Sequence, residues 1–310
     1  MKHTARSHRS VATLLATLST LFAFSGTALG QSKGTSGALS ATPAAPAPKS
    51  KTDSAAKSAT ETAALPSAQD IFAKAIEAAG GADLIRSQRS RTQTGTIEMP
   101  AASLKGAIVT KSVDPDMLLV ETEIPGFGKI RQGINGTIGW SIDPMRGASL
   151  MNADEIARIL RESSAESELN PALGCESVEV VERTSFSGAP CYKVKFLRGG
   201  DGSTRYYSVD SGHLVGSAEV VKSSMGEFEV TTTYKDFGDF SGRTVAKTQE
   251  NAMAGQTQVL KISVIDFGPI DPTNFALPAE IQTLVDATKT PPVAPPTAPA
   301  SPTDKSAAKK

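Results

Sequence analysis

A long succession of short segments in which apolar and polar residues alternate most constrains the fold of this chain. Roughly ten or eleven such segments lie between Gln93 and Asp266, with turn residues between them at intervals of about 8–12 residues. A period of two indicates strands with one buried face. We therefore predict a mainly β (α+β) fold, a single curved antiparallel meander that forms an open half-barrel, because a twisted sheet of this size curls.

Two segments have the spacing of helices instead. The first begins after Ser67, with an acidic residue three positions on, and ends at Gly80-Gly81. The second follows the strand that carries Trp140, the only tryptophan, and Asn152 can cap it. Its apolar residues recur at helical spacing. We place both helices on the concave side of the sheet, the second as a lid. The alternative is that this helix plugs the end of the sheet and that Trp140 is core.

The two ends of the chain differ in composition from its middle. Residues 1–30 combine basic residues, an apolar run and a small-residue end, which is typical of a cleaved signal peptide, with an uncleaved anchor as the alternative. Residues 31–66 and 286–310 are rich in Ala and Pro and hold too few apolar residues to offset the entropy of ordering. We predict a disordered linker and tail around one folded domain at residues 67–285.

These features also predict where the protein resides. The signal peptide places it in the periplasm or outside the cell, with no integral membrane span after signal removal. It holds three of the 32 basic and none of the 32 acidic residues, so the remaining chain carries a formal charge of −3. No basic face of a nucleic-acid-binding protein is indicated. We expect a monomer.

The two cysteines, Cys175 and Cys191, allow a disulfide in an oxidising compartment. The hairpin turn at Ser187-Gly188 pairs Cys191 with a position near Thr184 and away from Cys175. We therefore expect two buried or half-buried thiols, with a bridge as the alternative.

The sequence carries no signature of an enzyme. His213 is the only histidine after residue 30, and it follows a hairpin turn, where an exposed histidine is ordinary. One histidine and two separated cysteines do not make a zinc site, and no pair of carboxylates stands out for acid–base work. We predict no enzymatic activity, no catalytic residue, no metal and no cofactor.

Several turn and strand motifs resemble those of a known family. The chain is similar to the bacterial outer-membrane lipoprotein-sorting superfamily, the lipoprotein carrier and receptor proteins and their relatives, over most of residues 67–285. The resemblance implies an unclosed β-barrel with a helical lid and an apolar cavity that shields acyl chains. The motifs that carry it are Gly95-Thr96-Ile97, Asp114-Pro115-Asp116, Asn135-Gly136-Thr137-Ile138-Gly139-Trp140, Gly188-Ala189-Pro190-Cys191-Tyr192-Lys193-Val194, Tyr206-Tyr207-Ser208-Val209-Asp210 and Phe275-Ala276-Leu277-Pro278.

The candidate binding residues are apolar side chains that we expect on the concave face of the sheet and on the lid helix. Such side chains line pockets for apolar ligands, but they also fill ordinary cores, and the sequence leaves both readings open. The hypothesis is an envelope protein that binds lipid or the acyl chains of a lipoprotein, as a lipoprotein carrier does. The alternative is a cell-envelope sensor or protein-interaction module without lipid cargo. The candidates are Leu118, Val120, Ile130, Ile138, Trp140, Ile142, Ile156, Ile159 and Leu160.

Overall fold

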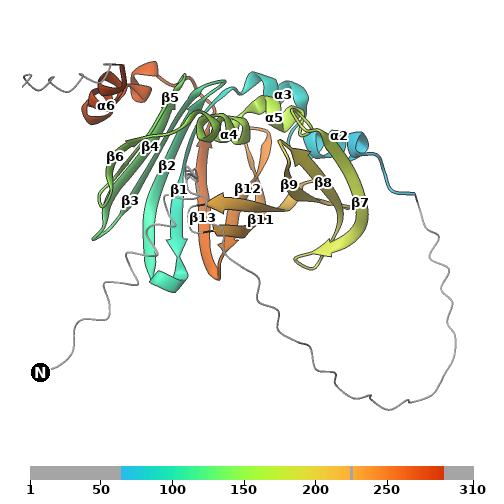
Figure 1. Ribbon diagram of the computed structural model, residues 1–310. Helices are drawn as coiled ribbons and strands as arrows, with labels where there is room; N and C mark the ends of the chain where they lie inside the picture. Colours follow the sequence, from blue (N-terminus) through green and yellow to red (C-terminus); the bar gives the residue numbers. More distant parts are fainter. Residues whose placement is uncertain (1–63, 224–225, 290–310) are drawn as a thin grey trace, which may run out of the picture.

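The computed structural model describes residues 64–223 and 226–289 (Figure 1). The predicted signal peptide, nearly all of the predicted linker and the chain from residue 290 lie outside the described residues. The predicted domain boundary at residue 285 falls within a helix that continues to Lys289.

Thirteen antiparallel strands form one open sheet that does not close into a barrel, so the predicted half-barrel is confirmed, with more strands than expected (Figure 1). The order across the sheet is β6-β5-β4-β3-β2-β1-β13-β12-β11-β10-β9-β8-β7. The strands are β1 (Ser90–Met99), β2 (Leu104–Val113), β3 (Met117–Ile124), β4 (Gly128–Asn135), β5 (Ile138–Asp143), β6 (Gly147–Leu150), β7 (Ser177–Phe186), β8 (Ala189–Arg198), β9 (Asp201–Ser208), β10 (Leu214–Ser223), β11 (Gly226–Phe240), β12 (Arg243–Met253) and β13 (Gln256–Asp266).

The meander is interrupted once. Strands β1 to β6 run from the middle of the sheet to one edge, and β7 to β13 return from the opposite edge until β13 pairs with β1. The chain therefore crosses the open side of the sheet between β6 and β7, and helices make that crossing (Figure 1). β6 has only four residues and was not predicted.

The helices lie around and across this sheet. The predicted first helix is confirmed as α2, where Ser67 and Asp70 form a capping box. The predicted second helix is confirmed as α4, capped in the same way by Asn152 and Glu155. The bounds are α2 (Ala68–Ala78), α3 (Ala82–Ser87), α4 (Ala153–Ser163), α5 (Ala165–Leu169) and α6 (Ala279–Lys289), with short 3-10 turns at Pro100–Ala102 and Pro272–Phe275.

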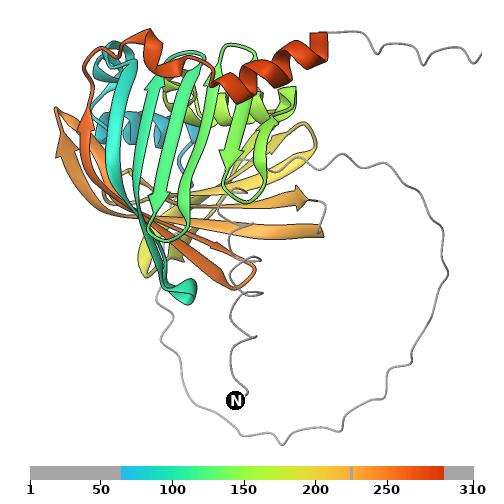
Figure 2. The same ribbon diagram turned by 90° about the vertical axis from the view of Figure 1, so that its left-hand side faces the viewer.

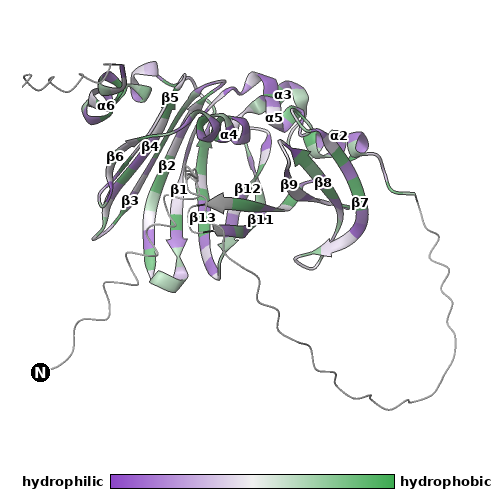
Figure 3. Cartoon of the chain, viewed as in Figure 1, coloured by the Kyte–Doolittle hydropathy of each residue, from purple (hydrophilic) through white to green (hydrophobic). Residues whose placement is uncertain are grey.

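Facing residues of paired strands show which side chains share a surface. We call the surface that carries Val120, and on which α4 packs, the concave face. It continues along the sheet through facing pairs such as Ile97 with Leu260 and Thr232 with Ser217. Apolar and polar residues alternate along these strands, as Figure 3 shows.

Helix α2 covers the other end of the concave face. Its Phe72 stacks on Phe196 of β8 with ring centroids 5.8 Å apart, and it contacts Tyr207 of β9. Val194, next to Phe196 on the same surface, is fully buried in this cluster. Aromatic packing of this kind fixes α2 on the sheet.

Part of the opposite face of the sheet is covered by α6, the red helix that lies across the green strands in Figure 2 and packs on β5 and β6. Its Ile281 and Val285 form a buried cluster with Trp140, and Ile138 and Ile142 pack against that cluster. The placement of these three strand residues on the concave face was therefore wrong. They lie on the opposite face because α6, a helix that was not predicted, covers them there.

Both cysteines are free thiols, as expected. Thr184 faces Cys191 across the hairpin of β7 and β8. Cys191 is buried and Cys175 is half-buried. Burial raises the pKa of the Cys191 thiol, which keeps it protonated and unreactive.

Candidate functional site

The candidate site lies where α4 crosses the concave face. Ile156 and Ile159 of α4 are buried against Leu118 and Val120 of β3, together with Ile134 of β4. Leu160, half-buried, packs against the same cluster. Five of the nine candidate residues therefore meet here, all of them from β3 or α4.

The remaining candidates lie elsewhere. Ile130 is on the concave face, facing Thr122, but belongs to a separate cluster with Ile97 and Ile124. Ile138, Trp140 and Ile142 lie on the opposite face under α6. The structure thus divides the predicted apolar set among three clusters, and only the one under α4 brings strand and lid residues together.

Sequence reasoning missed part of the cluster under α4. Ile108, Ile134, Met151 and Leu260 also belong to it. Ile134 has a visible signal, because it follows Ile130 at the period of a strand. Leu260 has none, because its position depends on the pairing of β13 with β1, which joins distant parts of the chain.

A glycine allows α4 to approach the sheet closely. A Cβ added to Gly139 of β5 would lie 2.6 Å from Ile156 Cγ1 and 3.0 Å from Met151 Cβ. The chain returns from β6 at this point, where Met151 N donates a hydrogen bond of 2.8 Å to the Gly139 carbonyl. The missing side chain therefore makes room for the docked helix.

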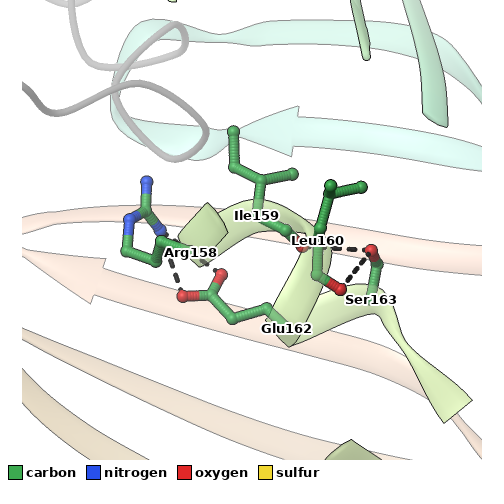
Figure 4. A network of polar contacts seen from close by, with 5 residues as sticks. All are labelled: Arg158, Ile159, Leu160, Glu162 and Ser163. Carbon is green, nitrogen blue, oxygen red and sulfur yellow. Dashed lines mark hydrogen bonds and ion pairs between the residues drawn. The ribbon is translucent and has the colours of Figure 1, made fainter. Parts of the chain in front are cut away.

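Arg158, Glu162 and Ser163 of α4 bond within the helix, and its apolar stripe makes the contact with the sheet (Figure 4). Arg158 pairs with Glu162 at 3.1 Å, and the Ser163 hydroxyl donates to the Ile159 carbonyl at 3.0 Å. In the described part of the chain, no hydrogen bond or ion pair joins a side chain of α4 to the sheet. Apolar contacts therefore hold this helix on the concave face.

The next helix, α5, is held by polar contacts instead. Glu168 forms an ion pair with Arg243 of β12, whose side chain is only 6% exposed. The carboxylate of Asp114 accepts a hydrogen bond of 2.9 Å from Ala165 N. Ser164 separates the two helices in an extended conformation, with φ −82° and ψ 143°. We call α5 and these partners the latch; Ser164 is both the C-cap of α4 and the N-cap of α5.

A buried carboxylate lies at the start of α4. Glu155 is 7% exposed and accepts a hydrogen bond of 3.3 Å from Asn152 N. Burial raises the pKa of Glu155, while the Asn152 hydrogen bond and the charge of Arg158 act in the opposite direction. Burial therefore penalises the charged form of this lid residue.

Beyond α4 the concave face becomes charged. The guanidinium of Arg205 lies over the Phe196 ring, 4.7 Å from its centroid. Desolvation raises the pKa of Glu219, as does the charge of Glu162, whereas the charges of Arg158 and Arg205 lower it. The charged edge of α4 thus faces the charged strands β9 and β10, and its apolar edge faces β3 and β4.

In the described part of the chain, His213 is the only histidine. The His213 ring stacks on Phe237 with centroids 4.3 Å apart, and burial lowers the pKa of His213. No hydrogen bond joins this ring to a carboxylate or hydroxyl in the described residues. Across residues 64–223 and 226–289 there is no group of three or more metal-ligating side chains. The same residues contain no helix with the length and apolarity needed to span a membrane.

No protein-family model matches the chain, and no curated protein matches its sequence. Solved structures do match. The LolA superfamily protein NE2245 from Nitrosomonas europaea is 14% identical, with a TM-score of 0.48, over 69% of this chain and 99% of that one. A DUF1329 family protein from Desulfovibrio piger is 12% identical, with a TM-score of 0.47, over 67% of this chain and 96% of that one.

A third match is the lipoprotein LppX from Mycobacterium tuberculosis, 10% identical with a TM-score of 0.28 over 66% of this chain and 99% of that one. Because these identities and TM-scores are low, we draw no functional conclusion from the matches. Of these three solved structures, the one from Nitrosomonas europaea is described as a LolA superfamily protein.

Proposed function

We propose that the protein binds lipid, or the acyl chains of a lipid-modified protein, between α4 and the concave face, and that it acts as a carrier and not as an enzyme. The observation that carries the proposal is the way in which α4 is held. Its apolar stripe contacts the sheet, while Arg158 and Glu162 pair within the helix and the latch fixes only α5. An apolar ligand can replace these contacts without breaking a hydrogen bond.

The cost of lifting α4 off the sheet and the gain from burying an acyl chain are of similar size. Exposing a buried Ile costs roughly 1.5–3 kcal/mol, so lifting Ile156 and Ile159 off the sheet costs about 3–6 kcal/mol. Each methylene of an acyl chain contributes about 0.8 kcal/mol on burial. About eight methylenes therefore offset the opening of the lid, and longer chains give net binding. The differential contacts of α4 with sheet and with ligand would drive the exchange.

Uptake of a fluorescent fatty acid, together with native mass spectrometry of the purified protein, tests this proposal. We expect bound lipid, saturable uptake and tighter uptake by Ile159→Ala, because the shortened side chain lowers the cost of lifting α4 off the concave face. The matched control is Ile142→Ala, the same change under α6, and it should leave uptake unchanged. Absence of both lipid and uptake would contradict the proposal.

The second candidate is an interaction module that uses the same fold without cargo. Ile156 and Ile159 are already 8% and 3% exposed, so in this conformation the lid residues fill the space above Val120 themselves. A partner protein captured from envelope extracts by the full chain, combined with no fatty-acid uptake, would favour this function.

The place of action follows from the sequence alone. The signal peptide at residues 1–30 directs the protein to the periplasm or outside the cell, and it lies outside the described residues. Fractionation of cells that express the full-length chain, with the mature N-terminus sequenced, tests this prediction.

A further inference from the structure

Three polar side chains lie side by side and buried on the concave face of β3–β5, next to the apolar cluster that α4 covers, with the buried Asp143 beside them on β5. Gln132 of β4 faces Ser141 of β5 directly, and Thr122 of β3 lies diagonally next to Gln132. Their exposed fractions are 6%, 7% and 6%, in the order Gln132, Ser141 and Thr122. Val120, which faces Gln132 on its other side, belongs to the cluster that α4 covers.

None of these three side chains makes a hydrogen bond to a described residue. The Nε2 atom of Gln132 is entirely buried and has no partner. A buried amide that loses its bond to water without gaining another destabilises the folded state. Such a group calls for an explanation in a native protein, because buried polar atoms are nearly always paired.

A second polar row on the same face shows the contrast. Thr232 donates to Asn251 at 3.0 Å, Gln249 Nε2 donates to Asn251 at 3.1 Å, and Asn251 lies 3.5 Å from Gln258 Oε1. This row on β11–β13 satisfies itself with hydrogen bonds. The three residues on β3–β5 do not, although they lie in the same sheet and are buried to the same degree.

We propose that Gln132 Nε2, flanked by Ser141 and Thr122, donates a hydrogen bond to the carbonyl oxygen of an acyl chain bound under α4. An amide N–H and two hydroxyls can all donate, and a carbonyl oxygen accepts. The hydrocarbon part of the ligand would lie against the apolar residues beside them, Leu118 and Ile134. This inference rests on the proposed function and assigns its ligand class: fatty acids and their esters or amides.

Two fluorescent probes of equal length test the assignment, one pyrene-labelled alkyl chain that ends in a methyl ester and one that ends in a methyl group. We expect the wild-type protein to bind the ester about tenfold more tightly, the size of one buried hydrogen bond. The affinities for probes that end in an amide or a carboxylate then show whether esters, amides or free fatty acids bind most tightly. Equal affinity for ester and alkyl probes in the wild type would overturn the assignment, and this comparison requires no variant.

Gln132→Met, which keeps the length of the side chain but removes the donor, should abolish the preference for the ester while retaining alkyl binding. Its ligand-free form should melt at a higher temperature, because an unpaired amide has been removed. The matched control Gln258→Met removes a partnered amide from the same face, so it should melt lower and keep the ester preference. A preference that survives in Gln132→Met would contradict the assignment. Failure of every probe to bind would overturn the proposed function itself, and this assignment with it.

Discussion

At the scale of single residues, the concave face combines close packing with unpaired polarity. Gly139 lets Ile156 approach the sheet, and Gln132 leaves a donor unpaired a short distance away. Glu155 adds a carboxylate whose charge is disfavoured by burial at the start of the lid. Each of these features costs stability or has little tolerance for change, and all three lie where α4 meets the sheet.

The titration of Glu155 should make the stability of the lid depend on pH. Because its pKa is raised in the folded state, its contribution is fully present below the ordinary carboxyl pKa of about 4.5 and is lost as the pH rises through the folded value. Glu155→Gln keeps an acceptor for Asn152 N but has no charge to bury. We expect the melting temperature of this variant to exceed that of the wild type at neutral pH and to equal it at acid pH. Calorimetry from acid to neutral pH measures both.

The control for this pH effect is Asp154→Asn, the neighbouring acid on the same helix turn, which is exposed. It should not reproduce the difference. A stability gain in Glu155→Gln that persists below the ordinary carboxyl range would show that packing, and not charge, is responsible.

At the scale of elements, α4 and α5 differ in the kind of contact that holds them. α4 rests on apolar side chains, and α5 is fixed through the ion pair of Glu168 with Arg243. Ser164, in an extended conformation, lies between the two helices. Under the proposed function, α4 is the helix that moves when a ligand binds, and the latch keeps α5 in place.

The latch should contribute measurably to the free energy of unfolding. Glu168→Ala leaves Arg243 buried without its partner, and we expect a loss of about 1–3 kcal/mol in chemical denaturation. Glu162→Ala removes the same side chain from the more exposed pair on α4 and should change stability by less than about 0.5 kcal/mol. Equal losses in the two variants would refute the distinction between the helices.

At the scale of the whole molecule, the sheet carries a separate core on each side. The side opposite the candidate site holds Trp140 at 2% exposure, under Ile281 and Val285 of α6. Because Trp140 is the only tryptophan, its fluorescence reports on that side alone. The docking of α6 can therefore be followed by this signal alone.

Ending the chain after Pro278 should expose Trp140. We expect a red shift of its emission and a loss of roughly 3–6 kcal/mol in stability, from the burial of Ile281 and Val285. A chain that ends at Lys289 keeps α6 and serves as the control, with unchanged emission. An unshifted spectrum after removal of α6 would contradict the described packing.

Much of the fold could be predicted from the sequence, because the alternation of residues and the capping residues Ser67 and Asn152 act locally. The face of the sheet on which each strand's apolar side chains lie was harder to predict. The Asn135-Gly136 turn makes Asn135 face Ile138, so Trp140 faces Gly133 and its side chain lies on the other face of the sheet from Ile130. This assignment of faces could be made from the sequence. The helix that covers Trp140 could not be predicted, because α6 contacts strands more than a hundred residues away.

The apolar attachment of α4 gives the molecule an uneven response to temperature. Contacts between hydrocarbon side chains weaken on cooling, whereas an ion pair such as that of Glu168 with Arg243 does not share this loss. Cooling should therefore weaken the docking of α4 before that of α5. Under the proposed function, the free energy needed to lift α4 for the exchange of an apolar ligand is then smaller at low temperature than at about 37 °C.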